Sequence, residues 1–265
     1  GPGPELFRLH FGDLCEPVQI LSFKVIALMI RDTILRMIKM AELRDPMESG
    51  AHVNRVGSYA VEIYEEWATR RGIDAEEIAR NKDPLKMAAI VHDVGKVGIT
   101  DLILKKPARL ETYEYELMKQ HTYLGAQLFS NQRSEYDKSA FMVTLNHHER
   151  WDGSGYPGYI DLLTGEPLHI SNGTIGTATG KKKDEIPLFA RIVAIADVFD
   201  ALSSERVYKE PWDESRVIET MDKERGRHFD PEVYDAFSSI LDIIRHIAAI
   251  YPDNHEPLQS GQRQH

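Results

Sequence analysis

Two adjacent histidines, His147 and His148, are the strongest sign of chemistry in the chain, because they run directly into a glycine-rich turn that ends in Gly155, Tyr156 and Pro157. A buried imidazole needs a hydrogen-bond partner or a metal at each ring nitrogen, so neighbouring histidines are rare as ordinary core residues. The glycines and the proline would end a helix and fold the backbone so that Tyr156 covers the pair. The stretch therefore predicts a metal site.

Further candidate ligands precede this stretch. Glu48 and His52 are four residues apart, so a helix would place the carboxylate and the imidazole on one face. His92 and Asp93 end an apolar segment, and Lys96 would lie one turn beyond His92 if the helix continued. Taken alone, each of these pairs is also common as a polar helix end or a structural hydrogen bond.

Two isolated residues complete the set. His121 lies among apolar residues, where a lone histidine is more often a hydrogen-bonded core residue, and Asp197 interrupts an apolar run, where an unpaired charge would be costly. One polynuclear site would explain all the candidates together. Mixed imidazole and carboxylate ligands without cysteine suit manganese, iron or zinc better than calcium or magnesium. The candidates are Glu48, His52, His92, Asp93, His121, His147, His148 and Asp197.

The segments that carry these residues have helical periodicity. We expect helices over 47–71, 84–93, 110–129, 138–150, 188–203, 212–225 and 231–251. Residues 158–185 differ and indicate a surface insertion with a β-hairpin, whose strands 168–171 and 174–177 would be joined by a type I′ turn at Asn172-Gly173. The predicted fold is all-α with one inserted hairpin.

The domain boundaries follow from these elements. Residues 1–16 read as a cloning remnant and disordered segment, since Gly1-Pro2-Gly3-Pro4 lacks an initiating methionine, and the chain would then be part of a longer protein. Residues 17–43 predict a helix that packs in the core, links to an upstream sensor or receiver domain, or forms a homodimer. Residues 44–257 would form the catalytic domain with its insertion 158–185, and 258–265 a tail.

The composition excludes several functions. The chain has 32 basic and 42 acidic residues, and its formal charge of −10 opposes binding to long nucleic acids. Its single cysteine excludes an internal disulfide, and without a signal-peptide pattern we expect a cytoplasmic location. The most apolar run, 18–30, is shorter than the roughly 18 residues that span a bilayer, so we expect no membrane span.

The order and spacing of these motifs resemble those of the HD-GYP phosphodiesterases, a subgroup of the HD-domain metal-dependent phosphohydrolases. The resemblance runs from about Arg44 to Tyr251 and includes 147–157, 198–202 and 229–231. It implies an all-α HD-domain bundle that hydrolyses cyclic di-GMP to pGpG and then GMP, with cyclic GMP-AMP as another substrate. Hydrolysis would use a hydroxide that bridges two metals and attacks the phosphorus in line.

The resemblance also implies roles for single residues. Glu48 would complete a site of three metal ions instead of two, with iron or manganese as the expected metal, and Asp93 would bridge two of them. The remaining ligands would be His52, His92, His121, His147, His148 and Asp197.

On the substrate side, Lys96 would contact the scissile phosphate, and Arg206 and Lys209 would hold phosphates of the dinucleotide. Tyr156 would pack against a guanine, and Asp200 would either orient a ligand or contact a base.

Two features depart from the family pattern. Thr100 stands where a proline is expected, and the insertion 158–185 replaces a short loop. The insertion could be a lid with Lys181, Lys182 and Lys183 near substrate phosphates, or a solvated flap, which we favour. Two other functions are the alternatives. The complete set of ligands favours an active enzyme over a catalytically weak module that binds the dinucleotide or a protein partner, and the Gly155-Tyr156-Pro157 turn argues against a phosphohydrolase of another nucleotide.

Overall fold

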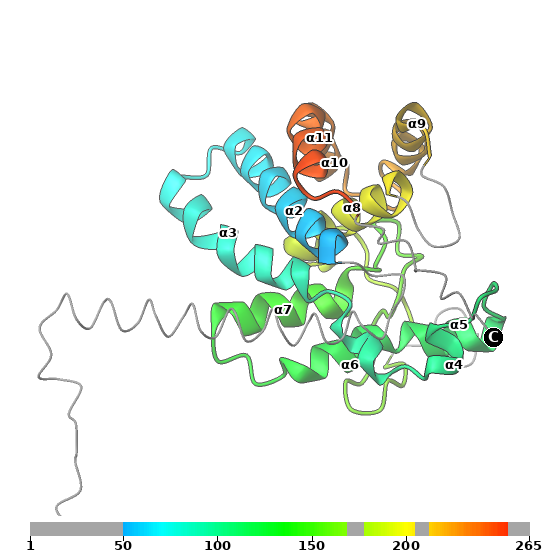
Figure 1. The fold of residues 1–265 in the computed structure, drawn as a ribbon. Coiled ribbons are helices and arrows are strands. Elements are labelled where there is room, and N and C mark those ends of the chain that lie inside the picture. Colours follow the sequence, from blue (N-terminus) through cyan, green and yellow to red (C-terminus); the bar gives the residue numbers. More distant parts are fainter. Residues whose placement is uncertain (1–49, 169–177, 205–211, 254–265) are drawn as a thin grey trace, which may run out of the picture. The chain divides into compact units, whose positions relative to one another are not determined.

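The computed structural model describes residues 50–168, 178–204 and 212–253, which form an assembly of helices (Figure 1). The α-helices are α2 (Gly50–Arg70), α3 (Ala75–Ile90), α4 (Asp101–Leu104), α5 (Thr112–Lys119), α6 (His121–Leu128), α7 (Glu135–Asn146), α8 (Leu188–Ser203), α9 (Glu214–Glu224), α10 (Pro231–Ser239) and α11 (Leu241–Ile250). Two 3₁₀ helices, η2 (Val94–Gly98) and η3 (Lys183–Glu185), join them. The all-α prediction is confirmed.

The hydrophobic core lies around α2 and α8. Figure 1 shows these two helices between α10 and α11 on one side and α6 and α7 on the other. Full burial of one large apolar side chain contributes about 1.5–3 kcal/mol to the stability of the fold. Because many such side chains are buried here, the core holds α2 and α8, and the residues that they carry, in fixed positions. Its largest fully buried members include Tyr59, Tyr64, Tyr234, Phe229, Phe237, Ile63, Leu85, Ile192, Ile195, Met221 and Ile244.

Two of the expected helices are broken in the structure. The helix expected over 110–129 is divided into α5 and α6 at Gln120, and the one over 231–251 into α10 and α11 at Ile240. Apolar periodicity continues through each break, so it could not reveal them. The first break makes His121 the opening residue of α6.

The start of α3 was also predicted wrongly. We expected Pro84 to open this helix, but it lies inside, and the helix begins nine residues earlier at Ala75. Asp74 caps the true start, because its side chain accepts a hydrogen bond from Glu77 N at 2.9 Å. The capping carboxylate, rather than the proline, sets the boundary.

A close backbone contact joins η2 to α6 at Gly95. A Cβ atom added to Gly95 would lie 1.9 Å from His121 O and 2.5 Å from Gly125 N, so no other residue fits this position without displacing the chain. The contact brings the residue before η2, Asp93, to the start of α6.

Several predicted elements lie outside the described residues. These are the helix over 17–43 and most of the β-hairpin, including its turn at Asn172-Gly173. Within the described ranges no residue belongs to a β-strand, and Ile160 and Pro167 form an isolated antiparallel bridge in the insertion. None of the helices in those ranges has the length and hydropathy that a membrane span requires.

Candidate metal centre

Seven of the eight predicted ligands lie in the described part of the chain, and the fold brings them together. They form two groups in which one donor atom from each residue lies within 4.8 Å of the others: Asp93, His121, His147 and His148 in the first, and His52, His92 and Asp197 in the second. Glu48 is outside the described residues. Each group has the mixture of imidazole and carboxylate donors expected for a transition-metal ion.

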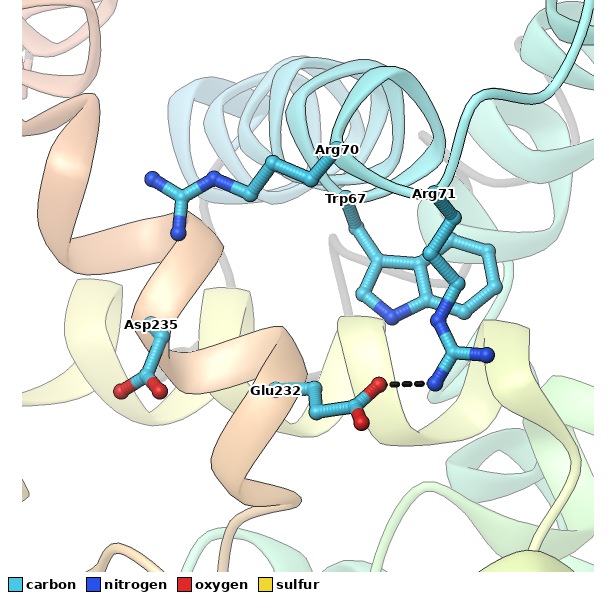
Figure 2. A pocket seen from close by; sticks show the side chains of 5 residues that line it. All are labelled: Trp67, Arg70, Arg71, Glu232 and Asp235. Carbon is cyan, nitrogen blue, oxygen red and sulfur yellow. Dashed lines mark hydrogen bonds and ion pairs between the residues drawn. The ribbon is translucent and has the colours of Figure 1, made fainter.

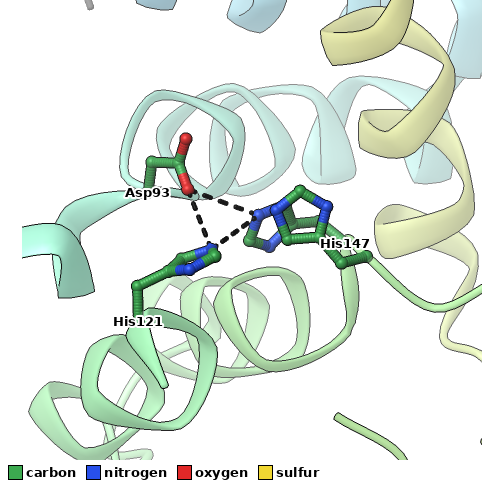
Figure 3. Close-up of side chains that lie close together, drawn as sticks. Asp93, His121 and His147 are labelled. Atoms are coloured by element: carbon green, nitrogen blue, oxygen red, sulfur yellow. Dashed lines mark hydrogen bonds and ion pairs between the residues drawn. The ribbon is translucent and has the colours of Figure 1, made fainter. Parts of the chain in front are cut away.

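The first group is centred on Asp93. Figure 3 shows Asp93, His121 and His147 reaching one point from three separate segments. Asp93 Oδ1 lies 3.0 Å from His121 Nε2 and 3.5 Å from His147 Nε2, and these two nitrogens are 3.4 Å apart. The ring of His148 is 4.0 Å from that of His147, centroid to centroid.

The second group adjoins the first. Asp197 Oδ1 lies 3.7 Å from His52 Nε2 and 3.8 Å from His92 Nε2. The same nitrogen of His92 is 3.2 Å from Asp93 Oδ2, the second oxygen of the carboxylate at the centre of the first group. The two groups therefore form one continuous cluster, with Asp93 between them.

Hydrogen bonds set the tautomer of the histidines. The Nδ1 atoms of His92, His121 and His147 each lie near a backbone carbonyl three or four residues earlier, at 2.8, 2.7 and 3.1 Å. A carbonyl can only accept, so Nδ1 donates its proton there. The Nε2 lone pair of each ring is left to face the cluster, as a metal ligand requires.

These lone pairs converge on a buried carboxylate. Among the described residues, Asp93 Oδ1 finds no hydrogen-bond donor, although His121 Nε2 and His147 Nε2 lie within 3.5 Å of it. Neutral nitrogen and carboxylate lone pairs repel one another when buried, and a cation among them would remove the repulsion. The donor atoms of the cluster therefore fit a divalent metal.

The electrostatics keep the ligands in their metal-binding forms. Burial opposes ionisation of Asp93, but the surrounding groups, with Lys96 as the largest contributor, outweigh it and hold the pKa of that carboxyl well below its usual range. Burial lowers the pKa of His147 and, more strongly, that of His148. An ionised carboxylate and neutral imidazoles are the forms that bind metal.

Lys96 lies beside the cluster, although not by the expected route. The α-helix ends at Ile90, before His92, and the 3₁₀ turn η2 instead places Lys96 Nζ 2.8 Å from Asp93 Oδ2. A fixed positive charge is thus adjacent to the central carboxylate.

The Tyr156 turn covers the cluster as predicted. The ring of Tyr156 stacks on His148 with centroids 4.7 Å apart and planes 27° apart, and Tyr156 N donates to His148 O at 3.1 Å. Burial raises the pKa of the Tyr156 hydroxyl, so it is protonated at neutral pH. The aromatic ring is one wall of the site.

Asp200 lies behind His52. It is 1% exposed; its Oδ2 is 2.8 Å from His52 Nδ1, and Arg55 donates to both of its oxygens at 2.6 and 2.9 Å. Burial opposes its ionisation, but these bonds outweigh burial and lower the pKa of Asp200. Both oxygens accept hydrogen bonds from side chains of the protein, an arrangement suited to the second expected role, orienting a ligand.

Arg55 was missed in the sequence. It is 3% exposed and also donates to Ser204 Oγ, Tyr251 O and Asp253 Oδ1. The available signal was its position, because it follows His52 by three residues and lies near the apolar residues Val53 and Val56 of α2. A charged residue at a core position needs a buried partner.

Glu149 was quoted only as part of the histidine block, but it has a structural role of its own. Its carboxylate, 2% exposed, accepts from Gly158 N at 2.6 Å and from Lys181 N at 3.1 Å. Burial raises the pKa of Glu149. One side chain beside His148 thus joins the two ends of the insertion.

At the return end of the insertion, Lys181 differs from the lysines that follow it. Lys181 is half-buried, its Nζ donates to Asn146 Oδ1 at 2.5 Å, and burial lowers its pKa. Lys182 and Lys183 are exposed. The two remaining predicted phosphate contacts, Arg206 and Lys209, lie outside the described residues.

A surface pocket of about 380 Å³ lies at the other end of α2 (Figure 2). It is lined by Trp67, Arg70, Arg71, Glu232 and Asp235. Trp67 follows His52 by fifteen residues, roughly 22 Å along the helix axis. The charged residues that line the pocket form ion pairs with oppositely charged side chains on the same surface. Their charged atoms therefore do not converge on one point, as the ligand atoms of the metal cluster do.

Comparison with known proteins shows the family to which this chain belongs. Residues 50–202 match the family model described as HD domain. The chain is 34% identical over 239 residues to 3′3′-cGAMP-specific phosphodiesterase 2 of Vibrio cholerae, covering 88% of this chain and 40% of that protein.

Two further relatives carry related names. The cyclic di-GMP phosphodiesterase response regulator RpfG of Xanthomonas campestris is 37% identical over 206 residues, 78% of this chain and 47% of its own length. A cyclic di-GMP phosphodiesterase of Thermotoga maritima is 35% identical over 228 residues, which cover 85% of this chain and 53% of that protein. The chain spans about half the length of these curated relatives. The matches confirm the predicted resemblance to HD-GYP phosphodiesterases, and the chain belongs to the HD domain family.

Proposed function

We propose that the chain is a divalent-metal-dependent phosphodiesterase that hydrolyses cyclic di-GMP to pGpG and then to GMP. The observation that carries this proposal is the convergence of imidazole Nε2 atoms on the buried carboxylate of Asp93, with Lys96 Nζ 2.8 Å from the same carboxylate. The names of the relatives support the substrate class.

The ligands we assign to the metal ions are His52, His92, Asp93, His121, His147, His148, Asp197 and Glu48. When bound, such ions supply a lowered pKa for water and compensation of the charge that builds on the phosphate oxygens. Two ions match the two groups of ligands, with Asp93 between them. A third ion requires Glu48, and the donor set suits iron or manganese.

The remaining residues of the site position the ligands and the substrate. Asp200 accepts the Nδ1 proton of His52 and thereby directs Nε2 towards the cluster, while Arg55 holds Asp200 in place. We assign to Lys96 the neutralisation of a phosphate oxygen, because its Nζ lies at the cluster, 2.8 Å from Asp93 Oδ2.

The walls of the site would bind the rest of the dinucleotide. We assign to Tyr156 an apolar contact with a base, since its ring covers His148. Arg206 and Lys209 follow the end of α8, which carries Asp197, and we assign them to the phosphates on grounds of charge and sequence position.

Cyclic GMP-AMP is a second candidate substrate, favoured by the name of the relative from Vibrio cholerae. Both substrates have the same phosphodiester linkages, so the metal cluster alone does not distinguish them. The distinction must come from contacts with the bases.

One experiment tests the function. Protein purified without oxygen and reconstituted with iron or manganese is incubated with each dinucleotide, and the products are resolved by chromatography. We expect pGpG followed by GMP. Recovery of intact dinucleotide from protein with a full metal content would contradict the activity and favour a binding module.

A homodimer through residues 17–43, or their connection to an upstream sensor or receiver domain, is also a proposal, based on the helical periodicity of this segment. Light scattering on the whole chain and on residues 44–265 tests the dimer. The same number of chains per particle in both samples would contradict a dimer formed through residues 17–43.

A further inference from the structure

A second aromatic side chain borders the site at Tyr156. The ring of Tyr115, on α5, lies edge-on to that of Tyr156, with centroids 6.2 Å apart and planes 79° apart. Tyr115 is 46% exposed, whereas Tyr156 is half-buried against His148. Tyr115 therefore offers an open aromatic surface one ring beyond the wall of the metal cluster.

Lys119 places a positive charge over both rings. Its Nζ is 5.1 Å from the centroid of Tyr115 and 5.4 Å from that of Tyr156, and it also donates to Glu116 at 2.7 Å. The ammonium has three N–H donors and no acceptor. Since α5 leads through Gln120 into α6, whose first residue is His121, the position of these side chains is tied to that of the metal ligands.

This combination suits one kind of base. An exposed aromatic ring stacks on any nucleobase, because every base has a π-face. A donor-only group at the edge of the base is selective: guanine presents two acceptors, O6 and N7, whereas adenine presents N7 and an amino group that is itself a donor. The ammonium would be attracted to guanine and would meet an N–H group on adenine.

We propose that Tyr115 and Lys119 form a guanine subsite, in which Tyr115 stacks on the base and Lys119 Nζ donates to O6 and N7. The inference rests on the proposed function, because the subsite adjoins the metal cluster through the contact of Tyr156 with His148. It makes Lys119 a determinant of specificity for guanine over adenine at this position.

Two other roles for Lys119 predict different results. A contact with a substrate phosphate would support every cyclic dinucleotide equally, since all share the same backbone. A purely structural cation–π contact would hold Tyr156 and Tyr115 in place, and its loss would lower thermal stability without changing base preference.

The test measures KM and kcat for cyclic di-GMP, together with the inhibition constant of cyclic di-AMP as a competitor. Lys119→Met keeps the length of the side chain and removes the charge. We expect a rise of about tenfold in KM for cyclic di-GMP, an unchanged kcat and an unchanged inhibition constant for cyclic di-AMP. Lys119→Arg, which restores the donors, should recover most of the affinity.

Tyr115→Ala should give a different pattern, with affinity for both dinucleotides about tenfold lower, because stacking does not depend on the identity of the base. The matched control is Lys138→Met on α7. Lys138 donates to Glu135 three residues earlier at 2.6 Å, as Lys119 does to Glu116, but it precedes His147 by nine residues. All constants should stay unchanged in this control.

The outcomes separate the two proposals. Equal changes for both dinucleotides in Lys119→Met, or no change for either, would overturn the guanine subsite while hydrolysis by the wild-type chain still supports the proposed function. Failure of the metal-loaded wild-type chain to hydrolyse any cyclic dinucleotide would instead contradict the proposed function itself.

Discussion

Arg55 holds Asp200 through two hydrogen bonds, and this pair connects His52 of the metal cluster with the end of α11. Arg55 Nε and Nη2 donate to the Asp200 oxygens at 2.6 and 2.9 Å, and Nη1 donates to Tyr251 O at 2.8 Å. Asp200 in turn lies 2.8 Å from His52 Nδ1. The direction of a candidate ligand on α2 therefore depends on residues that are about 150 and 200 positions later in the chain.

Arg55→Ala should destabilise the metal-free protein by about 3 kcal/mol or more, because it leaves the carboxylate of Asp200 buried without its main partner. Urea unfolding measures the loss, and elemental analysis should show a lower metal content. Arg55→Lys keeps the charge but loses the paired geometry, so it should be intermediate.

The control for this prediction is Arg245→Ala. Arg245 also donates two hydrogen bonds to one carboxylate, that of Glu214, but the pair is exposed on the surface. Exposed pairs contribute little, so stability and metal content should be unchanged. Similar losses in the two variants would contradict a special role for Arg55.

Gly95→Ala should separate η2 from α6, since the added Cβ would lie 1.9 Å from the backbone oxygen of His121. We expect a loss of about 3 kcal/mol or more and loss of the metal bound by Asp93 and His121. Gly98→Ala in the same 3₁₀ helix is the control, because the nearest atom to its Cβ would be Leu124 Cδ1, the end of a flexible side chain, at 2.9 Å. A metal content that falls equally in both variants would refute the explanation.

Glu149→Gln should loosen the ends of the insertion. One carboxylate oxygen accepts from Gly158 N and the other from Lys181 N, and an amide can accept at only one of these places. Amide hydrogen exchange at residues 158 and 181 should become faster. Glu185→Gln makes the same change at an exposed carboxylate, which accepts from Lys182 N, and should leave both amides as protected as in the wild type.

Lys96→Met should keep the metal content and lower kcat for cyclic di-GMP by about a hundredfold or more, the usual effect of removing one charge-stabilising donor. Lys105→Met removes a lysine that pairs with Asp101 on the surface and should have no effect. Full activity of Lys96→Met would exclude Lys96 from the reaction.

Glu48→Ala should lower the metal content by about one ion per chain, measured on protein purified without oxygen. The cluster formed by the described residues accounts for two groups of ligands, so a third ion depends on this carboxylate. Glu76→Ala, an exposed acid in the first turn of α3, is the control. A metal content that is the same in Glu48→Ala and wild type would contradict the trinuclear site.

Much of the fold could be predicted because apolar periodicity reports directly on helices that bury one face. The helix over 188–203 was predicted with the bounds that α8 has in the structure. The breaks at Gln120 and Ile240 were not predicted, since a helix can bend or restart without any change in which residues are apolar. The true start of α3 was missed because the helix was expected to begin at Pro84, whereas in the structure the cap at Asp74 begins it.

The sequence by itself determined the identities and the order of the candidate ligands, because metal chemistry depends first on the types of side chain available. Only the tertiary structure decided how they are arranged: seven residues divide into two adjoining groups, with Asp93 between them. That division depends on the backbone contact at Gly95 and on the bonds from Arg55 to Asp200. Both join segments distant in sequence, and such contacts follow from packing in three dimensions, which periodicity along the chain does not describe.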